Sequence, residues 1–230
     1  RNMAGDIGLI GGDEFRQGCE DMDREIMRAS GQDPVRVLIV PTAALDGPAR
    51  AADNGVRHFG ALGADARRLM VLERAQAGDA GLIQSSRGAG VVYFTGGSPD
   101  HLLATLRDSE LLKAILAAAD NGTVLAGSSA GAMVMGSYMR RPGSGEWVEA
   151  LGIVPGFAVL PHHESRDPAE LSRQLRAQAP ACLTVLGIDA RTGCLGGPGR
   201  WRVAGQGNVT VYRGAGWTIL GPGERLPGDV

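Results

Sequence analysis

The sequence predicts an α/β sandwich in one domain, with a mainly parallel central sheet and short antiparallel strands near the C-terminus. Short apolar runs alternate with amphipathic runs over most of the chain, which is typical of strands buried on both faces and joined by helices. From Gly193 onward, glycine-rich turns separate short apolar runs instead, a pattern that indicates hairpins. The 230 residues are 43% hydrophobic, enough for one sizeable core. No linker or repeat divides the domain expected over residues 1–230.

The expected strands of the main sheet are short runs dominated by apolar residues. In chain order they are Ile7–Ile10, Val37–Val40, Leu69–Leu72, Val91–Phe94, Thr123–Leu125 and Phe157–Leu160. The expected helices carry apolar residues at helical spacing. They cover Phe15–Ala29, Pro48–Leu62, Pro99–Leu106, Glu110–Ala119 and Ser129–Met139. Antiparallel hairpins at the sheet edge are expected from Trp201–Val203, Val209–Tyr212 and Trp217–Leu220.

Composition excludes several classes of partner. The chain has 23 basic and 25 acidic residues, without the basic excess that is typical of nucleic-acid binders. No run approaches the roughly 18 apolar residues of a membrane span, and the N-terminal residues lack the pattern of a secretory signal. Cys19, Cys182 and Cys194 show neither close pairing nor metal-type spacing, which favours a reducing compartment. We therefore expect a cytoplasmic protein that binds neither nucleic acid nor membrane.

The segment Gly127–Gly131 indicates a nucleophile. It reads Gly-Ser-Ser-Ala-Gly and fits Gly-x-Ser-x-Gly, with a predicted strand before it and a predicted helix after it. A serine on such a sharp turn lies above the carboxyl edge of the sheet, and its crowded backbone requires glycine two positions away on each side. The free N–H groups of the following helix point at the same place. These features make Ser129 the candidate nucleophile of a hydrolase.

A serine nucleophile needs a base, and the chain has four histidines. His58 lies within a helix among surface-type residues and is expected to be solvated. His101 opens a helix, where it could reach the site or face water. His162 and His163 follow the apolar run Phe157–Leu160, which places them at the carboxyl end of a strand, where the sites of α/β sheets form. The base is therefore sought in this pair.

A third group should orient the imidazole. The acidic candidates between nucleophile and base are Glu146 and Glu149, of which Glu146 is favoured. Adjacent histidines without a carboxylate or cysteine at ligand spacing do not form a metal site. We expect neither a metal nor an organic cofactor.

Together these segments resemble peptidase family S51, the family of aspartyl dipeptidases and cyanophycinases. The matching segments occur in the family's order from about residue 7 to residue 189. They are Leu9–Gly12, Phe94–Gly97, Gly127–Ala132, Leu151–Gly156 running into Leu160–His162, and Gly187–Asp189.

The resemblance implies a three-layer sandwich of the class I glutamine amidotransferase-like type and a Ser-His-Glu triad. It implies the roles of six residues: the nucleophile Ser129, the base His162, the acid Glu146, the oxyanion-hole amides of Gly97 and Ala130, and the substrate-binding Arg166. Such an arginine could hold an aspartate carboxylate in bidentate fashion.

Two segments depart from the pattern of cyanophycinases. Ser98-Pro99 stands where an acidic or amide residue and glutamine are usual, and Leu160-Pro161 stands where Asp-Gln is usual. The resemblance therefore favours a serine peptidase that cleaves after aspartate in Asp-X dipeptides or short N-terminal-Asp peptides. A cyanophycinase-like β-aspartyl peptidase, another hydrolase such as an esterase, and a non-catalytic binding module on the same fold are the alternatives. The expected partner is a small peptide that contains aspartate, and homo-oligomer formation stays open.

Overall fold

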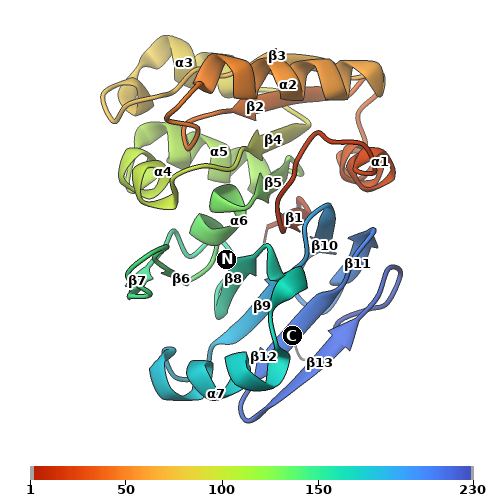
Figure 1. The fold of residues 1–230 in the computed structure, drawn as a ribbon. Helices are drawn as coiled ribbons and strands as arrows, with labels where there is room; N and C mark the ends of the chain where they lie inside the picture. Colours follow the sequence, from red (N-terminus) through yellow and green to blue (C-terminus); the bar gives the residue numbers. More distant parts are fainter. Residues whose placement is uncertain (1–2, 229–230) are drawn as a thin grey trace.

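The computed structural model describes residues 3–228, whose strands form three sheets (Figure 1). The largest has seven strands in the order β11-β10-β1-β5-β4-β2-β3, the second has the order β13-β12-β9-β8, and β6 pairs with β7. The strands are β1 (Ile7–Ile10), β2 (Arg36–Val40), β3 (Asp65–Arg68), β4 (Val91–Phe94), β5 (Val124–Ser128), β6 (Tyr138–Arg140), β7 (Trp147–Glu149), β8 (Phe157–Pro161), β9 (Thr184–Ile188), β10 (Thr192–Gly196), β11 (Arg202–Gly205), β12 (Val209–Arg213) and β13 (Gly216–Leu220).

The large sheet is parallel over β1, β5, β4, β2 and β3, while β10 and β11 add two antiparallel strands. Successive side chains of a strand point to opposite faces, and here they enter different cores. Leu9 packs into one apolar cluster and Ile10 into another, and Leu38 and Ile39 divide in the same way. Burial on both faces explains why these strands read as uninterrupted apolar runs.

Helices cover both faces of the large sheet. Buried residues of α1 and α2 belong to the cluster around Ile10, whereas α4, α5 and α6 pack into the cluster around Leu9. The helices are α1 (Glu20–Ala29), α2 (Pro48–Ala61), α3 (Ala80–Ser86), α4 (Pro99–Leu106), α5 (Glu110–Asp120), α6 (Ala130–Met135) and α7 (Pro168–Gln178), with short 3-10 turns at Gln76–Gly78 and His163–Ser165.

The second sheet corrects one expectation. Phe157–Leu160 forms β8, which pairs in parallel with β9 and not with the main sheet, and the predicted β12–β13 hairpin joins β9 rather than the main-sheet edge. One face of this sheet, through Val159 and Leu186, packs into the cluster around Leu9, while α7 covers the other face. The sheet and α7 fill the lower part of Figure 1.

Two predicted helices were too long. Helix α1 begins at Glu20 rather than at Phe15, because the preceding loop has left-handed backbone at Asp13 (φ 57°) and Phe15 (φ 64°). Helix α6 ends at Met135, and Tyr138–Arg140 forms β6. The predicted strand Leu69–Leu72 is wrong: the strand of this segment is β3, which ends at Arg68, and Leu69–Leu72 directly follows it.

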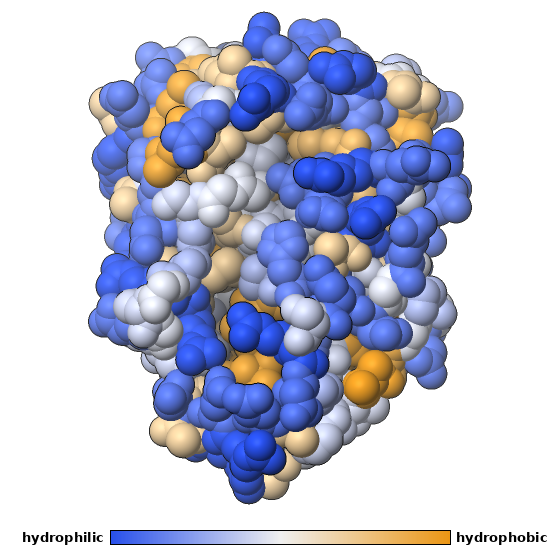
Figure 2. Space-filling view, viewed as in Figure 1, coloured by the Kyte–Doolittle hydropathy of each residue, from blue (hydrophilic) through white to orange (hydrophobic). Residues whose placement is uncertain are grey.

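The predicted fold class is confirmed: a mainly parallel central sheet flanked by helices, with antiparallel strands toward the C-terminus. Viewed as in Figure 1, the surface is mostly hydrophilic, with hydrophobic residues in small separate patches (Figure 2). Within residues 3–228, every helix is too short or too polar to cross a membrane.

Candidate active site

One cleft of about 770 Å³ contains the predicted nucleophile, the predicted base and the glycine turn. Ser129 follows β5, His162 follows β8, and Gly96-Gly97 follows β4. The loop after β1 and one side of α2 complete the wall. The cleft therefore lies at the carboxyl ends of strands from both larger sheets, as expected for sites of α/β folds.

Ser129 occupies a strained turn between β5 and α6. Its backbone has φ 50° and ψ −110°, a conformation that costs of order 1–3 kcal/mol for a residue with a side chain. A Cβ atom on Gly127 would lie 2.5 Å from the backbone of Gly131, and a Cβ on Gly131 would lie 2.4 Å from the Phe94 carbonyl oxygen. The spacing Gly-x-Ser-x-Gly is thus a requirement of backbone packing at this turn.

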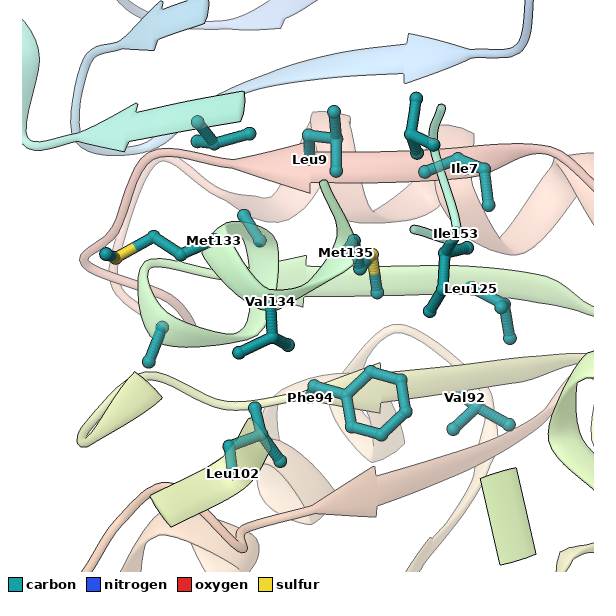
Figure 3. Close-up of a cluster of buried hydrophobic side chains, with 14 of the residues drawn as sticks. Ile7, Leu9, Val92, Phe94, Leu102, Leu125, Met133, Val134, Met135 and Ile153 are labelled. Atoms are coloured by element: carbon teal, nitrogen blue, oxygen red, sulfur yellow. The ribbon is translucent and has the colours of Figure 1, made fainter. Parts of the chain in front are cut away.

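The helix after Ser129 is held by apolar contacts. All six residues of α6 are buried, and Met133, Val134 and Met135 lie in the cluster that also contains Phe94 and Leu102 (Figure 3). This packing keeps the nucleophile turn in one position relative to the sheet.

His162 also has left-handed backbone, with φ 50° and ψ 49°. Its N–H donates to the Gly11 carbonyl at 2.9 Å, and the Ser129 N–H donates to the Ile10 carbonyl at 2.9 Å. A Cβ atom on Gly12 would lie 2.2 Å from the His162 ring. Consecutive carbonyls at the end of β1 therefore hold the candidate nucleophile and base, and Gly12 makes room for the imidazole.

The two neighbouring histidines have different environments. His162 lines the cleft, whereas His163 is 4% exposed and lies 2.7 Å from the Tyr212 hydroxyl through Nε2. Burial lowers the pKa of His163, although the charge of Asp189 acts in the opposite direction. His163 is therefore a core residue, and the cleft has His162.

This burial predicts a pH-dependent loss of stability. The folded-state pKa of His163 lies below the unfolded value of about 6.5, so the unfolded chain takes up the proton first as the pH falls. The folded state should lose stability as the pH decreases from about 6.5 toward the folded pKa. The midpoint temperature of thermal unfolding should change less between pH 7 and pH 5 in His163→Gln than in the wild type. The control variant His101→Gln should follow the wild type. Parallel curves for wild type and His163→Gln would contradict this assignment.

Neither predicted acid lies in the wall of the cleft. The Glu146 side chain is 59% exposed and its carboxylate lies 2.7 Å from Arg141, while Glu149 is exposed on β7. Glu164, two residues after His162, is an exposed carboxylate that makes no hydrogen bond to the His162 ring within the described residues. Its pKa is lowered: burial acts to raise it, but backbone N–H groups, including that of Ala190 at 2.9 Å, and both neighbouring imidazoles lower it. The predicted acid Glu146 is therefore wrong on geometry, because its carboxylate pairs with Arg141 away from the cleft.

Glu14 is a second residue that sequence analysis missed. It lines the cleft and accepts hydrogen bonds from the Gly96 N–H and the Ser128 hydroxyl, each at 2.8 Å. Its position just after Gly11-Gly12 was the available signal, but spacing alone did not relate it to loops more than 80 residues away.

His58 is not a solvated helix residue as expected. Its side chain is 9% exposed, lines the cleft and lies 2.7 Å from the buried carboxylate of Asp23. His101 instead lies 2.8 Å from the Leu72 carbonyl oxygen through Nε2. A buried carboxylate needs such a partner, and burial raises the pKa of Asp23 while His58 acts to lower it.

The cations of the cleft differ from the predicted one. Arg166 is exposed next to the His163 turn and is not part of the cleft wall. Arg16 and Arg57 line the cleft, and neither side chain has a hydrogen bond or ion pair within residues 3–228. The carboxylates of the wall are already engaged, since Glu14 accepts two hydrogen bonds and Asp13 lies 3.6 Å from Arg191.

Comparisons with known proteins identify the family and the fold of the chain. The profile of peptidase family S51 matches residues 8–194. A cyanophycinase from Trichormus variabilis is 30% identical over 217 residues, which cover 88% of this chain and 72% of the relative. A cyanophycinase from Geminocystis herdmanii is 30% identical over 231 residues, 94% of this chain and 83% of the relative. The crystal structure of a peptidase from an acI-B1 Actinobacterium superposes with a TM-score of 0.85 at 25% identity, covering 97% of both chains.

Proposed function

The chain belongs to peptidase family S51, and on this premise we propose that it is a serine peptidase that hydrolyses peptide bonds after aspartate. The observation that carries the proposal is the strained turn of Ser129, in the same cleft as His162 and the Gly96-Gly97 turn. The substrates would be Asp-X dipeptides or short peptides with N-terminal aspartate.

In the proposed reaction, His162 takes the hydroxyl proton of Ser129 as the oxygen attacks the carbonyl carbon, and then passes it to the leaving amine. The oxyanion would be held by the N–H groups of Gly97 and Ala130. Water then hydrolyses the acyl-enzyme, with His162 again as the base. Glu164, two residues after His162, would favour the imidazolium by its charge alone, since it makes no hydrogen bond to the ring within the described residues.

The free charge in the cleft supports an acidic substrate. Its acidic groups have partners, whereas Arg16 and Arg57 have none within the described residues. Guanidinium groups bind carboxylates in bidentate fashion. We propose that these two arginines, in place of Arg166, bind the side-chain carboxylate of the substrate's aspartate.

Labelling tests whether the protein is a serine hydrolase at all. A fluorophosphonate probe should modify the wild type at Ser129, which a peptide map would locate, and should leave Ser129→Ala unmodified. A wild type that folds but resists the probe would favour a non-catalytic binding module on the same fold.

Substrate selectivity tests the aspartate proposal. The wild type should cleave Asp-X dipeptides at least roughly a hundredfold better in kcat/KM than Asn-X dipeptides, because an amide leaves the arginines unpaired. The double variant Arg16→Gln/Arg57→Gln should bring this ratio close to one, chiefly by slowing the Asp-X peptides.

Two single variants serve as comparisons for that measurement. Arg28→Gln removes an exposed arginine of α1 outside the cleft and should retain the wild-type ratio. Arg166→Gln should retain it too, and a loss of selectivity there alone would return the carboxylate site to Arg166. Equal rates on Asp-X and Asn-X in the wild type would contradict the aspartyl specificity itself.

A second candidate function is hydrolysis of cyanophycin, favoured by the identity to cyanophycinases over most of the chain. Including cyanophycin in the same substrate panel separates the two, since only a cyanophycinase should release soluble peptides from it. Because Ser98-Pro99 and Leu160-Pro161 depart from the cyanophycinase pattern, we propose the aspartyl peptidase first.

A further inference from the structure

The carboxylate of Glu14 joins two loops of the cleft. Oε1 accepts the Gly96 N–H at 2.8 Å, and Oε2 accepts the hydroxyl of Ser128 at 2.8 Å, one residue before the candidate nucleophile. We propose that Glu14 is a positioning residue that fixes the Gly96–Gly97 peptide relative to Ser129, so that the Gly97 N–H meets the developing oxyanion. This inference rests on the proposed function.

The peptide between two glycines needs such a restraint, because glycine has the widest backbone freedom of any residue. The residues on either side are held by backbone hydrogen bonds donated by Thr95 and Ser98. Between them, the Gly96 N–H has Glu14 as its acceptor. The Gly97 N–H has no hydrogen-bond partner in the described part of the chain. Glu14 therefore binds the Gly96 N–H and leaves the Gly97 N–H available to the oxyanion.

The turn, Glu14 and the nucleophile lie close together. A Cβ atom built on Gly96 would be 3.1 Å from Oε1 of Glu14 and 3.4 Å from Cβ of Ser129. A side chain at Gly96 would thus press on both. If the carboxylate is lost, the turn can shift or rotate directly beside Ser129, and an oxyanion donor that is misplaced contributes little.

The effect of Glu14 must come from geometry rather than from charge. A negative carboxylate near a developing oxyanion is unfavourable by Coulomb's law. Both carboxylate oxygens accept hydrogen bonds from the loops of the cleft, and within residues 3–228 none joins Glu14 to His162. A glutamine can provide the same links, because its Oε1 accepts the Gly96 N–H and its Nε2 donates to the hydroxyl oxygen of Ser128.

Three substitutions of Glu14 test the proposal with the Asp-X substrate. Glu14→Ala should lower kcat about a hundredfold, the order seen when one oxyanion donor is lost, with KM within about twofold. Glu14→Asp retains the charge but is one methylene too short to reach both partners, and should lose at least about tenfold in kcat. Glu14→Gln should stay within about threefold of the wild type.

Glu20→Ala is the matched control, since Glu20 accepts the Gly18 N–H at 2.7 Å at the end of the same loop but does not line the cleft. It should have wild-type kcat. If Glu14→Ala does not fold, the aspartate and glutamine variants decide. An active Glu14→Asp with an inactive Glu14→Gln would overturn the proposal, because the charge would then be essential. So would an unchanged kcat in a folded Glu14→Ala.

Labelling by the fluorophosphonate separates this inference from the proposed function. A wild type that the probe does not label contradicts the hydrolase function. A wild type and a Glu14→Ala variant that are labelled at the same rate overturn only the positioning role.

Discussion

Ser129→Ala is expected to lower hydrolysis of Asp-X peptides by roughly a millionfold, the order found when a serine protease loses its nucleophile. The substitution removes the one atom that would form the acyl-enzyme. Alanine can take the same backbone path, so the fold should be retained. Residual rates measured with purified variant protein, together with its circular dichroism and thermal unfolding, check this expectation. Near wild-type turnover by a folded Ser129→Ala would refute the mechanism.

Ser129→Gly is the informative companion of the alanine variant. At φ 50° and ψ −110° the backbone of a residue that has a Cβ atom is strained. Glycine in its place relieves a strain of order 1–3 kcal/mol. The greater entropy of glycine in the unfolded chain offsets about 0.5–1 kcal/mol of this gain. The glycine variant should therefore be inactive and yet unfold at a higher temperature than the alanine variant. A lower unfolding temperature would show that the turn is not strained by its side chain.

His162→Ala is expected to have the second largest effect, a loss of about 10⁴-fold or more in kcat/KM, because a serine hydroxyl without a base is a poor nucleophile. The matched variant is His163→Gln, which changes the adjacent ring but keeps a polar group near Tyr212. It should retain activity within about tenfold at neutral pH and affect mainly stability.

Comparing the His162 and His163 variants decides which of two consecutive residues is the base. His162 lines the cleft and His163 lies in the core. If His163→Gln proves the more damaging change in kcat/KM while its unfolding temperature is unaltered, the base has been assigned to the wrong ring.

The parts of the fold that local pattern could predict are those whose burial or backbone crowding limits which residue types can occupy them. The parallel strands and the turn at Gly127–Gly131 belong to this class, because burial on both faces and backbone crowding leave a direct trace in residue type. The loop at Asp13–Gly18 does not: its amphipathic sequence resembles a helix, yet left-handed residues and contacts to distant loops determine its path.

Partners contributed by distant segments could not be read from spacing. Glu14 meets Gly96 and Ser128, and Arg57 reaches the cleft from α2. The same limit explains the assignment of Phe157–Leu160 to the main sheet, since an apolar strand does not reveal which sheet it joins. The choice of Glu146 followed from chain order, whereas the observed surroundings of His162 depend on the fold of the second sheet.

The end of β1 has a consequence for biosynthesis. The carbonyls of Ile10 and Gly11 hold the backbones of Ser129 and His162, and β1 lies between β5 and β10 in the sheet. During synthesis β1 is made well before its partners β5 and β10, and until they follow it is an unpaired apolar strand that is open to aggregation. The cleft cannot form before then, and a nascent chain is therefore inert toward peptides around it, its own unfolded segments included.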